Sequence, residues 1–259
     1  MRPGALDLLR CPACGGVLEL SASLEDGLGK VLEGELICSS CSASYRVREG
    51  IPDLLVPACL GAGNKLSKAL YDLYAPLYDL LEDRLARLLG FTEEGLRQEI
   101  ASFLDLDADR GQRVLEVCVG TGGNLPYIRA RTEGLVVGLD ISERMLRICQ
   151  AKVRELGLGD IWLFRGCAEY LPFKDGFFHR VLIGGGISYF SDIRRALSEA
   201  ARVAVDDGLI VVFEQVTVLE RLLGKALLPL RYLPPGLRPL ELKWLFGHRF
   251  YLLKLAREH

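Results

Sequence analysis

Residues 115–128 read LEVCVGTGGNLPYI: a short apolar run, a glycine-rich turn and the beginning of a helix. A second apolar run, LVVGLD at 135–140, follows and ends in an acidic residue. Strands that alternate with helices form parallel sheets, and ligands bind at the carboxyl ends of those strands. This stretch therefore predicts the first half of a doubly wound α/β sheet with a ligand at the turn.

The chain after this stretch continues the alternation of apolar runs and helical segments. Further strands are predicted over 161–165, 178–183 and 209–214, with a helix over 191–203 and a turn at Asp207-Gly208. The run RFYLLKLA at 249–256 is predicted as the closing strand, paired in a hairpin with the residues before Gly247. The regular alternation favours a parallel sheet for this part of the chain.

Glu116, at the end of the first strand, discriminates between two classes of cofactor. A dinucleotide site needs GxGxxG to hold a pyrophosphate at the helix N-terminus, but Leu125 occupies the third glycine position. A carboxylate there would repel pyrophosphate, whereas it suits the ammonium and sulfonium groups of S-adenosylmethionine. Asp140 suits the ribose of either cofactor. We therefore expect S-adenosylmethionine, and the alternative is a ligand-free turn with a solvated glutamate.

Residues 113–215 resemble the class I S-adenosylmethionine-dependent methyltransferases, in the branch that includes the quinone-biosynthesis C-methyltransferases. The motifs that carry the resemblance are VLEVCVGTG, VVGLDIS, GCAEYLPF and ALSEAARVAVDDGLIVV. The resemblance implies a Rossmann-like, seven-stranded methyltransferase sheet. It also implies the following cofactor-binding residues: Glu116, Gly120, Thr121, Gly122, Asp140, Ile141, Cys167, Ala168 and Gly184.

Two positions depart from the pattern of that family. The family often has aspartate where this chain has Cys167, and glycine where it has Cys118. Both departures bear on cofactor affinity. His179 stands where the family often has aspartate at the start of the fourth strand, and we interpret it as structural.

The methyl acceptor is expected beside the cofactor, past the strand at 178–183. Methyl transfer from a sulfonium is an in-line displacement, which needs positioning and desolvation more than acid–base groups. No NPPY-type motif is present in this loop, so the catalytic residues stay unassigned. The acceptor-side candidates are Gly184, Gly185, Gly186, Ile187, Tyr189 and Glu214, although loop geometry and a structural role are equally open explanations.

Two CxxC pairs near the N-terminus, Cys11/Cys14 and Cys38/Cys41, predict a structural zinc ribbon over residues 1–57. A domain this small buries little apolar surface, so a metal is the expected source of stability. CPACG and the segment GIPDLL at 50–55 resemble the zinc-ribbon activator subunits of tRNA, rRNA and release-factor methyltransferases. The resemblance implies that this chain carries its activator in cis.

The segment 58–111 is predicted to connect the two domains. It comprises a linker at 58–65, an amphipathic helix over 66–88 with Tyr71, Tyr74 and Tyr78, and a helix over 92–104. This bridge is expected either to pack on the core or to form a lid over the cofactor.

The core is predicted over 112–259, with a leucine-rich insertion at 216–246. The insertion carries five basic and two acidic residues. It is expected to pack on the sheet, to form a pocket for an apolar acceptor, or to make a peripheral membrane contact.

Composition narrows the function further. The 259-residue chain has 50% apolar residues and a net charge of −2, which gives no drive toward nucleic acid or anionic membranes. No stretch of 18 uncharged apolar residues and no signal peptide is recognisable, so a cytoplasmic location is expected. The scattered Cys59, Cys118, Cys149 and Cys167 are expected to be free thiols in a reducing compartment.

Three functions remain open from the sequence. The first is methylation of a small apolar molecule, such as a quinone or lipid precursor. The second is methylation of tRNA or rRNA. The ribbon counts against it, because residues 1–60 carry eight acidic and five basic residues and so bind phosphate poorly. The third is a non-catalytic scaffold that binds S-adenosylmethionine, supported only by Cys118 and Cys167. The sequence indicates neither the acceptor atom nor the oligomeric state.

Overall fold

The computed structural model describes residues 1–27, 29–59, 90–106, 111–216 and 227–258. Three predictions fall partly or wholly outside these residues. They are the linker from residue 60 onward, the helix over 66–88 with its tyrosines, and residues 217–226 of the leucine-rich segment.

The N-terminal part forms a small antiparallel sheet with the strand order β1-β2-β3-β4. Its strands are β1 (Leu18–Glu25), β2 (Val31–Cys38), β3 (Ser44–Arg48) and β4 (Ile51–Pro52), between the 3-10 helices η1 (Pro3–Asp7) and η2 (Pro57–Cys59). In β3, Tyr45 and Val47 are buried while their neighbours are exposed, the alternation of a sheet with one solvated face.

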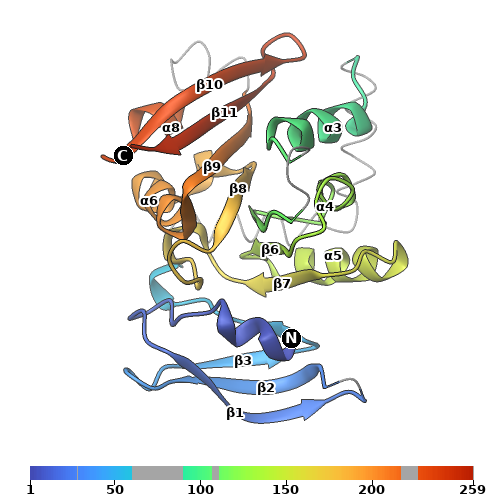
Figure 1. Cartoon of the computed structure of the whole chain (residues 1–259), viewed down its shortest axis with the longest axis vertical. Helices are drawn as coiled ribbons and strands as arrows, with labels where there is room; N and C mark the ends of the chain where they lie inside the picture. The colour runs from blue at the N-terminus through green and yellow to red at the C-terminus, as the bar shows by residue number, and fades with distance from the viewer. Residues whose placement is uncertain (28, 60–89, 107–110, 217–226, 259) are drawn as a thin grey trace.

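The C-terminal part forms a seven-stranded sheet with the order β10-β11-β9-β8-β5-β6-β7, as Figure 1 shows. Its strands are β5 (Val114–Val117), β6 (Val136–Asp140), β7 (Ile161–Arg165), β8 (Phe178–Gly184), β9 (Ala204–Gln215), β10 (Leu237–Leu245) and β11 (Phe250–Arg257). The five strands from β9 to β7 are parallel, and β11 is antiparallel to both of its neighbours. The predicted seven-stranded methyltransferase sheet is confirmed.

Helices cover both faces of this sheet. One apolar cluster contains side chains of α3 (Glu93–Phe103), α4 (Leu125–Arg129) and α5 (Glu143–Glu155). The cluster on the other face contains side chains of α6 (Ile193–Val203). All residues of β5 and β6 are buried, as expected for central strands of a parallel sheet that is covered on both faces.

Each of the three longer helices begins at a capping side chain. Thr92, Ser142 and Asp192 each accept a hydrogen bond from the backbone N–H three residues later. The helices predicted over 92–104 and 191–203 correspond to α3 and α6. No helix was predicted over 143–155, where α5 lies.

Two details of the sheet differ from the sequence interpretation. The predicted turn at Asp207-Gly208 lies inside β9, where the pairing shifts from Phe178↔Ala204 to Arg180↔Leu209. The four residues between Ala204 and Leu209 are accommodated as an irregularity in the strand. Residues 237–245 form β10, paired with β11 in the predicted hairpin, so this end of the leucine-rich segment belongs to the sheet.

The ribbon lies against β7, the edge strand opposite β10 (Figure 1). Three backbone hydrogen bonds join the two parts. They run from Leu54 N to Arg165 O at 2.8 Å, from Arg10 N to Pro172 O at 2.9 Å, and from Lys174 N to Leu8 O at 2.9 Å. Both parts also share one apolar cluster, in which Leu8 and Leu54 of the ribbon pack with Phe164 and Phe173. The ribbon therefore holds both ends of the segment 165–174.

Candidate functional site

A cavity of about 250 Å³ opens at the carboxyl ends of the central strands. Residues from β5, β6 and β8 and from the loops that follow them line it, together with residues of α3, β9 and β11. This is where the doubly wound topology places ligands.

The glycine-rich turn after β5 forms one wall of the cavity. Three residues there have left-handed backbones: Cys118 (φ 61°), Gly120 (φ 55°) and Gly122 (φ 80°). A Cβ added to Gly122 would lie 2.7 Å from the Cys149 sulfur, so this glycine is required for packing. A Cβ added to Gly120 would meet no protein atom within 4 Å, and Gly120 lines the cavity. The backbone at Gly120 is therefore open to a ligand.

Asp140 lies at the carboxyl end of β6 and lines the cavity. Its two carboxylate oxygens accept hydrogen bonds from Gly120 N at 2.9 Å and from Ser142 N at 2.8 Å. These bonds fix the carboxylate between the turn and the start of α5, so Asp140 is oriented before any ligand binds.

Glu116 lies beneath the turn rather than at its mouth. It is 1% exposed, it accepts a hydrogen bond from Asn124 Nδ2 at 2.6 Å, and it is absent from the cavity lining. Burial raises its pKa to about 7, against the lowering effects of the Asn124 hydrogen bond and of Arg97. Glu116 is therefore a buried carboxyl group outside the cavity lining, and its part in cofactor binding stays a prediction.

The cavity is surrounded by carboxyl groups. Burial raises the pKa of the Cys118 thiol well above its usual value, and the carboxylates of Asp140, Glu169, Glu214 and Glu116 raise it further. Among the described lining residues, Arg97 of α3 is the only arginine or lysine. It donates to Asn124 Oδ1 at 3.3 Å and pairs with Glu93. The excess of carboxyl groups therefore favours a ligand with a net positive charge.

Aromatic side chains line another part of the cavity. Tyr189 and Phe190 follow the glycines after β8, and Phe213 and Phe250 come from the neighbouring strands. The rings of Phe213 and Phe250 stack with their centroids 5.6 Å apart. Tyr189 is 47% exposed, so it lies near the opening. Such a lining favours a planar, apolar ligand.

Glu214 ties the loop after β8 to the end of β9. Its carboxylate accepts from Ser188 N at 3.1 Å and from Gly186 N at 3.4 Å. Gly185 and Gly186 have φ of 97° and 80°, a conformation that favours glycine. Glu214 thus holds the loop in place, and its carboxylate is also part of the cavity lining.

Cys167 contradicts the expectation of scattered free thiols. It lines the cavity at the start of η4 (Ala168–Tyr170) and forms a disulfide with Cys59 of η2, 108 residues away in the sequence. Cys118 and Cys149 are free thiols, as expected. The structure brings Cys59 and Cys167 together because the ribbon docks beside the segment 165–174, which no sequence spacing indicates.

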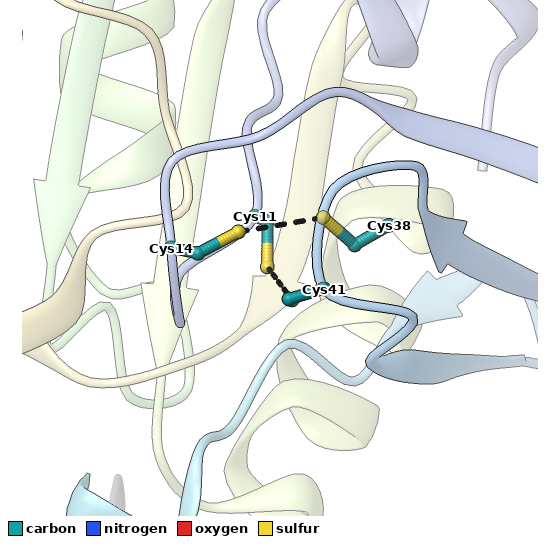
Figure 2. A group of neighbouring side chains, drawn as sticks. All are labelled: Cys11, Cys14, Cys38 and Cys41. Atoms are coloured by element: carbon teal, nitrogen blue, oxygen red, sulfur yellow. Dashed lines mark hydrogen bonds between the residues drawn. The ribbon is translucent and has the colours of Figure 1, made fainter.

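The four N-terminal cysteines converge in one cluster, drawn in Figure 2. Their sulfur atoms lie within 4.8 Å of one another, with 3.8 Å between Cys11 and Cys41 and 3.5 Å between Cys14 and Cys38. A tetrahedral zinc site with bonds of about 2.3 Å has sulfur–sulfur edges of about 3.8 Å. Burial opposes ionisation of Cys38, but backbone N–H groups of Cys41 and Ser40 lower the pKa of its thiol to about 6 overall. The cluster therefore fits zinc.

The structure brings most predicted site residues to the cavity. The following ones line it: Gly120, Asp140, Ile141, Cys167, Ala168, Gly184, Gly185, Gly186, Tyr189 and Glu214. Glu116, Thr121, Gly122 and Ile187 are outside the lining. His179 accepts a hydrogen bond from Arg113 N through Nδ1, which agrees with a structural role.

Several lining residues were not predicted. Arg97, Met145, Phe190, Phe213 and Phe250 belong to elements that are distant from the glycine-rich turn in sequence. Glu169 lies within the quoted motif GCAEYLPF but was not proposed for the site. The sequence signal that could have pointed to Arg97 is its position as a basic residue in a capped helix, α3, that directly precedes the sheet.

Two family models match the chain. The ubiE/COQ5 methyltransferase family model covers residues 69–232, and the Trm112p-like protein model covers residues 3–50. No helix in the described ranges has both the length and the apolar character that crossing a bilayer requires.

Named relatives agree with the larger match. The demethylmenaquinone methyltransferase of Lactiplantibacillus plantarum is 34% identical over 57% of this chain and 61% of the relative. That of Geobacillus kaustophilus is 38% identical over 42% of this chain and 47% of the relative. The chain thus spans less than two thirds of the length of these relatives.

The solved [4+2]-cyclase SpnF has the same fold, with a TM-score of 0.58 at 16% identity over 74% of this chain and 95% of that one. This likeness concerns the fold alone, because one fold hosts several kinds of chemistry.

Proposed function

This chain belongs to the ubiE/COQ5 methyltransferase family, and on that basis we propose that it transfers a methyl group from S-adenosylmethionine to a small planar acceptor of the quinone class. The observation that carries the proposal is one cavity with two kinds of wall. Carboxylates and open glycine backbone form one part of it, and aromatic rings form the other. The first suits a cationic nucleoside, and the second suits an apolar ring.

The cofactor supplies an electrophilic methyl group, and the residues of the chain position it. Asp140 is held so that its carboxylate can accept hydrogen bonds from ribose hydroxyls. Ile141 and Met145 provide apolar surface for adenine, and Ala168 provides a backbone N–H in the same wall. Glu116, buried below the turn, favours the positive sulfonium when it is ionised.

Arg97 is the proposed partner of the cofactor carboxylate. The methionine moiety is zwitterionic, and a wall made of carboxylates alone would repel its anionic end. The guanidinium of Arg97 lies against Gly123 of the turn, since a Cβ added there would be 3.2 Å from Arg97 Nε. Its side chain is 14% exposed and is held by Glu93, which pre-orients it toward the cavity.

The acceptor is proposed to lie among Tyr189, Phe190, Phe213 and Phe250. Two relatives are named demethylmenaquinone methyltransferases, and a naphthoquinol ring is planar and apolar, as these side chains favour. Methylation at a ring carbon releases a proton from that carbon. Glu214 lines the cavity and is the proposed acceptor of the proton, directly or through a hydroxyl of the quinol.

The ribbon is proposed to hold zinc through Cys11, Cys14, Cys38 and Cys41, as a structural element. Its likeness to Trm112p supports an activator role in cis, which agrees with its bonds to both ends of the segment 165–174. Thiolate ligands need a reducing compartment, and we propose the cytoplasm as the location.

RNA methylation has less support, because the ribbon that resembles Trm112p is acidic and already docked on this chain. A non-catalytic scaffold stays as the second candidate. The observation in its favour is that Cys167 is engaged in a disulfide at the position where the family often has aspartate.

The test has two stages. Calorimetric titration of the zinc-loaded chain should show binding of S-adenosylmethionine and no binding of NAD. Transfer of labelled methyl to a reduced demethylnaphthoquinone that carries an isoprenoid chain should follow. Tyr189→Ser should raise the KM for the quinol and leave cofactor affinity unchanged. Tyr232→Ser, which changes a similarly exposed tyrosine outside the cavity lining, should change neither. Cofactor binding without transfer to any quinol would favour the scaffold.

A further inference from the structure

Two cysteines join the ribbon to the wall of the cofactor cavity. Cys59 ends η2, the last described element of the ribbon, and is 1% exposed. Cys167 is 4% exposed and lines the cavity directly before Ala168. Their disulfide spans 108 residues of sequence, so it connects the two parts of the chain covalently.

The chemistry of the chain makes this bond unusual. Zinc binding needs four thiolates at Cys11, Cys14, Cys38 and Cys41, which exist only where thiols are kept reduced. Disulfides in such a compartment are typically transient and serve catalysis or redox sensing. The chain therefore combines two kinds of cysteine. The four N-terminal cysteines are reduced, and bound zinc would protect them from oxidation, whereas Cys59 and Cys167 form a disulfide.

The cavity gives one side of the pair a route to solvent. Cys167 lines a space that opens to solvent, whereas Cys59 is absent from the lining. Of the two cysteines, Cys167 therefore lies on the side from which a small thiol or disulfide would approach, and a bound cofactor would occupy that space. Exchange at the pair is thus tied to occupancy of the site.

We propose that Cys59 and Cys167 form a redox-active pair that exchanges with low-molecular-weight disulfides and sets the affinity of the cofactor site. The inference rests on the proposed function, because the cofactor is the ligand whose affinity changes. The oxidised pair is the tighter-binding form.

The reaction balances through two exchanges. The Cys167 thiolate attacks a small disulfide, which forms a mixed disulfide and releases one small thiol. The Cys59 thiolate then attacks the Cys167 sulfur of the mixed disulfide, forms the Cys59–Cys167 bond and releases the second small thiol. Two protein thiols are oxidised, and one small disulfide is reduced to two thiols.

The direction of the effect follows from what the bond restrains. The segment 165–174 is hydrogen-bonded to the ribbon by Leu54 at Arg165 and by Arg10 at Pro172. Cys167 lies between these two points, and the disulfide is a third attachment of the same segment to the ribbon. A wall fixed in its binding conformation loses less conformational freedom when a ligand binds. Reduction should therefore weaken binding by about threefold or more.

Thermodynamic linkage between cofactor binding and disulfide formation supplies a second, independent measurement. If oxidation tightens binding by a given factor, saturating cofactor must favour disulfide formation by the same factor. The fraction of oxidised pair in glutathione buffers, mapped by mass spectrometry, should shift when S-adenosylhomocysteine is added. Cys11, Cys14, Cys38 and Cys41 should stay unmodified in the zinc-loaded chain.

The decisive experiment compares S-adenosylhomocysteine affinity of the oxidised and reduced full-length chain by calorimetry. Cys59→Ser keeps the Cys167 thiol but cannot form the bond. It should bind like the reduced wild type in reducing buffer, and with a small disulfide it should carry a mixed disulfide at Cys167 and show no gain in affinity. The proposal is overturned by equal affinities of the oxidised and reduced wild type, by a gain in affinity on oxidation that persists in Cys59→Ser, or by a bond from Cys167 to Cys118 instead. Absence of ligand binding in both forms would overturn the proposed function, while the mass-spectrometric mapping would still report whether the pair forms.

Discussion

Arg165 Nη1 lies 2.5 Å from Asp53 Oδ2, and the same two residues form a parallel β-bridge. Arg165 ends β7, and Asp53 follows β4 directly, so one point joins the two sheets through both main chain and side chain. The two side chains are 16% and 30% exposed, which shields the pair in part from water. This contact adds to the backbone hydrogen bonds and the shared apolar cluster that hold the ribbon against β7.

Asp53→Ala should lower the free energy of unfolding by about 1–3 kcal/mol, because it leaves a largely buried guanidinium without its closest carboxylate. Urea denaturation of the zinc-loaded chain measures the effect. Asp206→Ala removes an exposed partner of Arg257 and should stay within about 0.5 kcal/mol of wild type. Equal losses in the two variants would mean that the Asp53–Arg165 pair adds nothing to docking.

Glu116 should make stability depend on pH. Its folded-state pKa of about 7 lies above the ordinary value of 4.5, so the folded chain retains a proton that the unfolded chain releases. The free energy of unfolding should therefore fall between pH 4.5 and pH 7, by up to about 3 kcal/mol, and level off above pH 7. Glu116→Gln keeps an oxygen for Asn124 and should remove this part of the pH dependence. Parallel pH profiles for both proteins would contradict the assignment.

Asp140→Asn should weaken cofactor binding by about 10- to 100-fold, the scale of one lost hydrogen bond to a charged group. Adenosine should lose affinity by a similar factor, since the proposed contact is to ribose. Calorimetry with both ligands measures the two ratios. Asp160→Asn, which alters a surface carboxylate paired with Arg2, serves as the control and should bind normally. If affinity survives in Asp140→Asn, the ribose lies elsewhere.

Arg97→Met should discriminate between two ligands of the same site. S-adenosylhomocysteine carries the amino acid carboxylate, and methylthioadenosine lacks it. The variant should lose about tenfold or more in affinity for the first and little for the second. Arg131→Met changes an arginine bonded to Tyr127 O and Ser102, outside the cavity, and should affect neither ligand. A uniform loss for both ligands would indicate that Arg97 only supports the fold.

Removal of zinc should destabilise more than the ribbon. Structural zinc can contribute on the order of 10 kcal/mol to folding, and Leu8 and Leu54 share a core with Phe164 and Phe173. Chelation should lower the melting temperature of the whole chain and weaken cofactor binding, and added zinc should restore both. An unchanged melting curve after complete removal of metal would show that the cysteines do not need it.

The sequence predicted the individual strands of the large sheet well because the signals for strands are local. The runs at 135–140 and 161–165 correspond to β6 and β7 within one residue. The sequence also carries a local signal for α5 that the prediction lacks: Ser142 caps the helix, and the buried Met145, Leu146 and Cys149 recur at helical spacing. The residues before Gly247 were predicted to pair with the closing strand, and β10 occupies that position.

The parts of the site that could not be predicted depend on tertiary contacts. Arg97 reaches the cavity only because α3 packs beside α4 and the glycine-rich turn. Cys59 and Cys167 meet only because the ribbon docks on β7. Glu116 lies in β5, where every residue is buried, and its carboxylate accepts a hydrogen bond from Asn124, so its depth depends on tertiary packing.

Because the ribbon is part of the same chain as the sheet on which it docks, dilution cannot separate the two. An activator that is a separate chain dissociates on dilution, with a midpoint set by its dissociation constant. Under the proposed function, the covalent link supplies one ribbon per methyltransferase domain at a local concentration on the order of millimolar. Specific activity should therefore be independent of protein concentration down to the nanomolar range, and an excess of free ribbon should neither activate nor inhibit the chain.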